Sequence, residues 1–92
     1  MLTFNLKKEW FEKIKSGEKT HKYREVKEYW VKRLNNYINH PFRYNMIKFK
    51  KGYLKGNELY ANVKEIKIIN GKNTDLAIDK DVFDIEFELI KA

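Results

Sequence analysis

The chain has 92 residues, of which 42% are hydrophobic and 15% aromatic, so it can form one domain with a single modest core and is not of the disordered class. It contains no cysteine, which excludes disulfides, thiol nucleophiles and Cys-based metal sites. The formal net charge is +7, and 17 of the 20 basic residues are lysine. This excess of positive charge has two interpretations. It could form a surface that binds nucleic acid, or it could reflect lysine used for solubility in a protein from an AT-rich genome.

The first five residues lack the basic-then-apolar pattern of a signal peptide. No apolar run approaches the roughly 20 residues that a helix needs to span a bilayer. We therefore expect a cytoplasmic protein with no membrane partner. His21 and His40 are the only histidines and do not have the spacing of metal ligands, so we expect neither a metal nor a cofactor.

The first half of the chain predicts a strand, a helix, a strand and a second helix. Apolar and polar side chains alternate over residues 2–6, which is typical of a strand. Residues 7–16 place three apolar side chains on one helical face: Trp10, Phe11 and Ile14. Gly17 follows where a left-handed C-cap would end the helix. A second strand is predicted over residues 19–24, and a second helix with the same apolar periodicity over residues 27–38.

The second half is rich in strand patterns. Strands are predicted over residues 44–49, 59–68 and 83–89. In the middle one the apolar alternation slips by one residue near Lys64-Glu65, which predicts a β-bulge that bends the strand.

The element order β-α-β-α-β-β-β predicts a single α+β domain over residues 1–92. We expect a small β-barrel or a strongly curved, mostly antiparallel sheet with two flanking helices. Residues 74–81 are expected to hold one helical turn. The last strand alternates apolar residues with three acidic ones, which predicts a charged edge strand: Asp84, Glu86 and Glu88.

Residues 17–24 are the most informative part of the sequence, because six consecutive residues contain three cations, a histidine and a tyrosine. Side chains alternate between the two faces of a strand. One face would therefore carry Lys19, His21 and Tyr23, and the other Thr20, Lys22 and Arg24. Basic groups on both faces suit a groove or pocket for an anion or a polar planar ligand.

Residues 6–20, continuing to Tyr23-Arg24, resemble the signature of ASCH domains, which are small PUA-like β-barrels. Their motif has the form G-x-K-x-x-E-x-R, and its matching positions here are Gly17, Lys19 and Arg24. Residues 25–30 and 49–53 look like short ASCH proteins common in phage genomes. The resemblance implies a PUA-like fold and association with RNA or modified bases. Lys22 replaces the acidic residue of the motif, which raises the local positive potential and favours anion binding.

One branch of this family consists of small amidohydrolases that deacylate N4-acetylcytidine. That branch uses the Lys of the motif, a Thr three residues later and a Glu from a longer helical insert. In this sequence Lys19 matches the first group, Lys22 stands at the Thr position, and the insert is reduced to roughly residues 70–81. The resemblance therefore does not carry the activity over.

The leading hypothesis is that a basic cleft between the barrel and its helices binds RNA or a nucleotide-like ligand. Its candidate contacts are basic and aromatic side chains: Lys19, His21, Lys22, Arg24, Lys48, Lys50 and Tyr53. Tyr53 lies in a lysine-rich loop, where it could stack on an unpaired base or plug the end of the barrel. One alternative is a hydrolase of a modified nucleoside or RNA, with Lys19 as the candidate catalytic residue. Another is a phage protein that binds and inhibits a host defence protein through a surface such as the helix at 27–38.

Overall fold

The computed structural model of the protein describes residues 1–52 and 57–90, so Tyr53 lies outside the described residues. The elements follow in the order β1 (Leu2–Leu6), α1 (Lys8–Lys15), β2 (His21–Glu25), α2 (Glu28–Asn39), β3 (Met46–Lys51), β4 (Glu58–Asn70), the 3-10 helix η1 (Gly71–Asn73) and β5 (Asp81–Leu89). The predicted α+β class is therefore confirmed. No helix in these residues is both long and apolar enough to cross a membrane.

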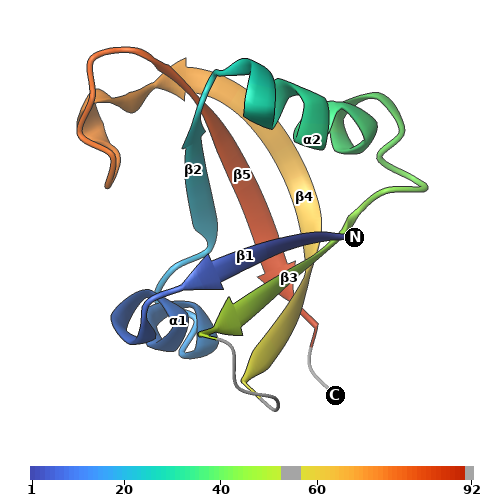
Figure 1. Ribbon diagram of the computed structural model, residues 1–92, viewed down its shortest axis with the longest axis vertical. Helices are drawn as coiled ribbons and strands as arrows, with labels where there is room; N and C mark the ends of the chain where they lie inside the picture. The colour runs from blue at the N-terminus through green and yellow to red at the C-terminus, as the bar shows by residue number, and fades with distance from the viewer. Residues whose placement is uncertain (53–56, 91–92) are drawn as a thin grey trace.

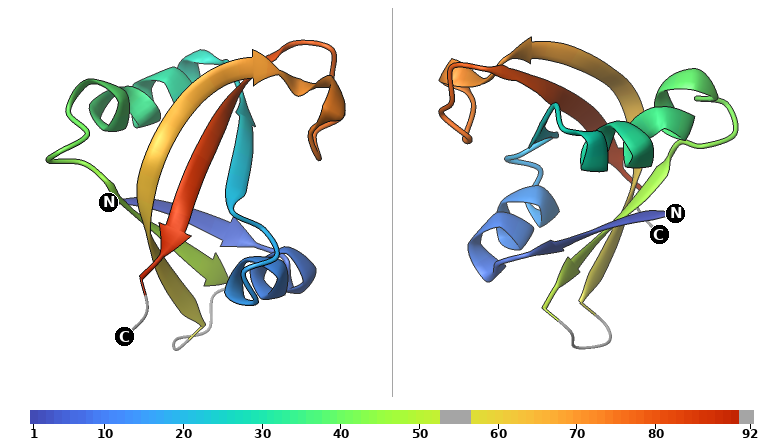
Figure 2. Two further views of the ribbon diagram at one scale, coloured as in Figure 1. Left: turned by 180° about the vertical axis from the view of Figure 1, so that it is seen from behind. Right: turned by 45° about the horizontal axis from the view of Figure 1, so that its top comes forward.

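The five strands form one sheet in the order β1-β3-β4-β5-β2. Only β1 and β3 run parallel; the other three pairings are antiparallel. The sheet curls strongly into a half-barrel whose two edges are β1 and β2, with α2 near one end and α1 near the other (Figures 1 and 2). The prediction of a strongly curved, mostly antiparallel sheet with two flanking helices is confirmed.

The curvature has a local cause in β4, the longest strand. Its pairing with β5 shifts register between Val63 and Glu65, at the predicted bulge. Before the shift Ala61 pairs with Leu89, and after it Ile66 pairs with Ile85. Because the extra residue restores the alternation, apolar side chains stay on the inner face while the strand bends.

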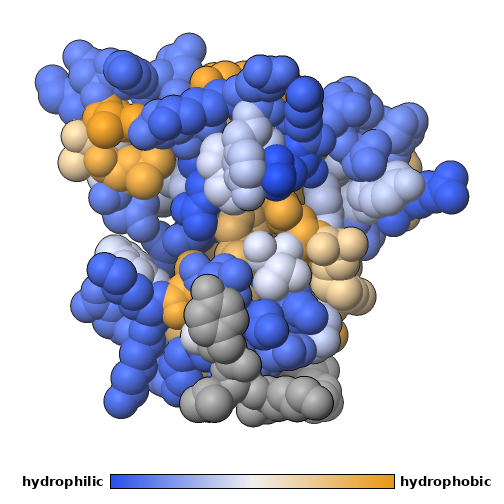
Figure 3. All heavy atoms as spheres, viewed as in Figure 1, coloured by the Kyte–Doolittle hydropathy of each residue, from blue (hydrophilic) through white to orange (hydrophobic). Residues whose placement is uncertain are grey.

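The core lies on the inner face of the half-barrel and includes side chains from both helices: Phe4, Leu6, Phe11, Ile14, Leu34, Tyr37, Ile47, Phe49, Ala61, Phe83, Ile85 and Phe87. The Tyr37 hydroxyl donates to the Met46 carbonyl at 2.6 Å and accepts from the Leu2 amide at 2.9 Å, which fastens α2 to β1 and β3. Figure 3 shows that one face is largely polar, with apolar atoms exposed between α2 and β1 and over the loop after η1. The open side of the half-barrel is thus filled by side chains.

Three sequence predictions of local structure are corrected. The second strand begins at His21, because the Lys19 amide still bonds the Lys13 carbonyl of α1 at 3.1 Å. The helical turn expected at 74–81 occurs earlier, at η1, because the Asn70 side chain accepts a bond from the Lys72 amide. The acidic strand β5 is not an edge, since it lies between β4 and β2.

Candidate anion-binding site

Strand β2 divides its side chains between the two faces of the sheet. Lys22 pairs with Ile85 and Arg24 with Phe83, and both partners belong to the core, so these cations are on the inner face. His21 and Tyr23 therefore point outward, as the alternation predicts. Lys19 precedes the strand and lies in the loop after α1.

Lys22 is the one buried charged residue in the part of the chain that the structure describes, with 8% of its surface exposed. Within that part it forms no ion pair or side-chain hydrogen bond. Lys22 is therefore a largely desolvated cation.

Arg24 spans the seam between the two edge strands, β2 and β1. Its guanidinium carbon lies 5.0 Å from the ring centroids of both Phe4 and Trp30, and these rings stack at 5.7 Å. One guanidinium nitrogen donates to the Tyr23 carbonyl at 2.8 Å. Among the described residues no carboxylate forms an ion pair with Arg24. Most of the N–H donors of its guanidinium group are therefore available to a ligand.

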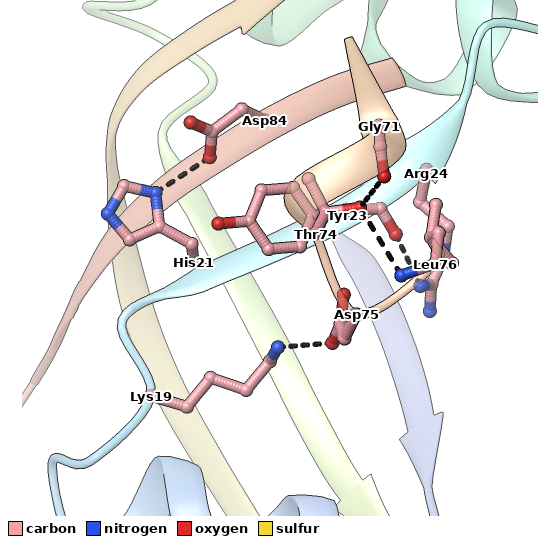
Figure 4. A network of polar contacts seen from close by, with 9 residues as sticks. All are labelled: Lys19, His21, Tyr23, Arg24, Gly71, Thr74, Asp75, Leu76 and Asp84. Carbon is pink, nitrogen blue, oxygen red and sulfur yellow. Dashed lines mark hydrogen bonds and ion pairs between the residues drawn. The ribbon is translucent and has the colours of Figure 1, made fainter. Parts of the chain in front are cut away.

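Lys19 has a different environment, because it is neutralised by a carboxylate. Its Nζ lies 2.5 Å from the Asp75 Oδ2, and its side chain is 12% exposed (Figure 4). The same Nζ is 5.1 Å from the centroid of Trp10 and 5.4 Å from that of Tyr23. Asp75 comes from the loop after η1 and was not among the residues predicted from the sequence.

The three cations and Asp75 interact electrostatically. Burial, followed by the charges of Arg24 and Lys19, lowers the pKa of Lys22 from 10.5 to about 8, and Asp75 opposes this only in part. Burial also lowers the pKa of Arg24, again against the effect of Asp75. Three cations therefore share one carboxylate, which leaves a local excess of positive charge.

His21 lies on the outer face, on the opposite side of the sheet from Lys22 and Arg24. Its Nδ1 is 2.7 Å from the Asp84 Oδ1, and its Nε2 is 3.7 Å from the Glu86 Oε2. A hollow of about 70 Å³ beside it is lined by two further charged residues, Glu65 and Lys67. These acidic neighbours make His21 a poor anion contact. No group of three or more His, Asp or Glu residues in the described ranges is arranged to hold a metal ion.

Lys48 and Lys50 also lie on the outer face, because Ile47 and Phe49 occupy the inner one. Both lysines are near Glu58, at Nζ–carboxylate distances of 3.7 and 3.9 Å. The structure thus brings together Lys19, Lys22 and Arg24, and places Lys48 and Lys50 on the other side of the sheet. Their role as ligand contacts stays a prediction.

A groove of about 480 Å³ lies next to Lys19, between the end of α1 and the end of β5. Its walls combine apolar and polar side chains: Ile14, Lys15, Ser16, Lys19, Thr20, Phe87, Glu88 and Leu89. Gly17 also lines it and has a φ of +84°, the left-handed conformation expected at the end of the helix. This groove has the composition that a planar ligand with polar edges requires.

A comparison of the chain with known protein families finds no family model that matches it, and a comparison with curated proteins finds no match. The likeness to ASCH domains therefore remains a resemblance carried by the motif residues.

Proposed function

We propose that the protein binds an RNA or nucleotide-like ligand, whose anionic group contacts Lys22 and Arg24 at the seam between β2 and β1. One observation carries the proposal: neither of these inner-face cations forms an ion pair within the described residues, and Lys22 is buried. Removing a cation from water without an anionic partner is unfavourable. A bound phosphate would provide that partner.

The surroundings favour a nucleotide over a simple inorganic anion. Aromatic side chains border two of the cations: Trp30 lies beside Arg24, and Trp10 and Tyr23 lie beside Lys19. Stacking of a base on an aromatic ring contributes roughly 1–3 kcal/mol. The partly apolar groove next to Lys19 offers a second place for a base. The net charge of +7 adds long-range attraction for a polyanion.

The test is a titration with a short single-stranded RNA at about 50 and 200 mM salt. Two or three phosphate contacts predict that affinity falls roughly 7- to 18-fold over this range, at about 0.7 log units per contact and log unit of salt. Lys22→Gln and Arg24→Gln should each weaken binding more than Lys64→Gln, which removes the same charge from an exposed position of β4. Absence of binding at the lower salt would refute the proposal.

A second candidate is a hydrolase of a modified nucleoside, and the Lys19–Asp75 pair favours it. The sequence predicts no carboxylate near Lys19, yet Asp75 supplies one from the reduced insert. A lysine and a carboxylate in contact could move protons during hydrolysis. Incubation with N4-acetylcytidine tests this: release of cytidine that Lys19→Ala and Asp75→Asn both abolish would establish it, whereas intact substrate would eliminate it.

A further inference from the structure

We infer that Lys22 is a reactive amine that condenses with the carbonyl of an aldehyde or ketone bearing a phosphate or carboxylate group. The inference deepens the proposed function and rests on it, because the cations that attract a nucleotide would also hold this anionic group. The product is an imine between the Lys22 Nζ and the carbonyl carbon of the ligand.

The position of Lys22 favours the neutral amine that such a reaction needs. Its side chain lies on the inner face opposite Ile85, with no carboxylate paired to it in the described residues. Desolvation and neighbouring cations are the two conditions that activate a lysine as a nucleophile. With its pKa lowered to about 8, roughly a quarter of the amine is neutral at pH 7.5, against about 0.1% for an ordinary lysine.

Lys19 is the natural comparison within the same site. Its Nζ lies 2.5 Å from the Asp75 Oδ2, so this nitrogen is engaged in an ion pair, whereas the Lys22 Nζ forms none within the described residues. Arg24, which forms no ion pair within the described residues, is therefore suited to attracting the anionic group of the ligand, while Lys22 attacks its carbonyl. Arg24 cannot replace Lys22, because a guanidinium stays protonated.

The reaction balances without a further reactant. The Nζ lone pair attacks the carbonyl carbon and a C–N bond forms. Both hydrogens of the neutral amine then leave with the carbonyl oxygen as water, and a C=N bond remains. No oxidation or reduction takes place. A ligand without a carbonyl, such as AMP, would occupy the site and leave Lys22 unmodified.

The test uses pyridoxal 5′-phosphate, which carries an aldehyde and a phosphate, followed by borohydride to fix any imine as a stable amine. Cleavage after Glu18 and Glu25 releases a peptide of seven residues that contains both Lys19 and Lys22, and fragmentation of this peptide locates the label. At substoichiometric probe, Lys22 should be modified at least about 10-fold faster than the exposed Lys64, given the difference in neutral amine. AMP should protect Lys22 and leave the labelling of Lys64 unchanged.

A parallel measurement of AMP binding by tryptophan fluorescence separates the two claims, since Trp10 and Trp30 both border the site. If AMP binds but the label is spread evenly over the lysines, the inference is overturned and the proposed function stands. If AMP neither binds nor protects, the proposed function fails, whereas faster labelling of Lys22 than of Lys64 would still support the reactive amine. Lys22→Arg, checked for folding by circular dichroism, should lose the rapid label.

Discussion

Replacing Lys22 by methionine is expected to stabilise the folded protein at neutral pH while weakening its binding of anions. Methionine keeps the unbranched stem and removes the buried charge. The fall in the pKa of Lys22 from 10.5 to about 8 means that folding disfavours the charged form of this side chain by roughly 3 kcal/mol. Relaxation of the site and the remaining exposure of the side chain reduce this penalty, so Lys22→Met is expected to raise the free energy of unfolding by about 1–3 kcal/mol.

The stabilisation produced by Lys22→Met should become smaller as the pH rises. Well below pH 8 Lys22 is protonated in both the folded and the unfolded chain, and its full unfavourable contribution is present. Between about pH 8 and 10.5 the unfolded chain binds more protons at this residue, so the free energy of unfolding of the wild-type protein rises with pH. The difference between wild type and Lys22→Met should therefore shrink across this interval.

Urea unfolding at pH 7 and pH 10 provides the assay, with Lys64→Met as a control for the loss of an exposed lysine. The control should change the free energy of unfolding by less than about 0.5 kcal/mol. A destabilisation of more than 1 kcal/mol by Lys22→Met at pH 7 would refute the reasoning, because it would mean that the folded protein itself stabilises the Lys22 charge.

Three further outcomes are expected. Anion affinity should decline as pH rises through about 8, because Lys22 loses its charge there; equal affinities in AMP titrations at pH 6.5 and 9.5 would contradict this. Asp75→Asn should tighten RNA binding several-fold by releasing Lys19, and a filter-binding assay that shows weaker binding would refute the role given to this pair. Tyr37→Phe should lower the free energy of unfolding by about 1–3 kcal/mol, because the Met46 carbonyl and the Leu2 amide lose their hydrogen-bond partner. An unchanged urea unfolding curve would show that these two hydrogen bonds do not stabilise the contact between α2 and the sheet.

The features that the sequence predicts correctly are those with a local signal. The slip in apolar alternation around Lys64 lies within one strand, and it yields both the bulge and the bend. The opposite faces of Lys22 and Tyr23 follow from the two-residue period of a strand. Gly17 ends the first helix because the left-handed conformation is accessible to glycine.

Several features that were wrong or missed depend on how distant segments meet, whereas the start of β2 and the position of η1 depend on local hydrogen bonds. Asp75 is 56 positions from Lys19 in sequence, and its loop comes close to Lys19 because it leads into β5, which pairs with β2. The alternation of side chains in β5 identifies its apolar face but not the strands beside it. Its position between β4 and β2 therefore could not be predicted from the sequence pattern.

The most direct test of the central claim is an NMR titration of the ¹⁵N-labelled protein with a short single-stranded RNA at low salt. We predict that the largest shifts occur at the amides of Lys22 to Arg24 and at the indole groups of Trp10 and Trp30, and that they disappear in Arg24→Gln. Shifts confined to the outer face, around Lys48 and Lys50, would contradict the assignment of the inner-face cations as the binding site.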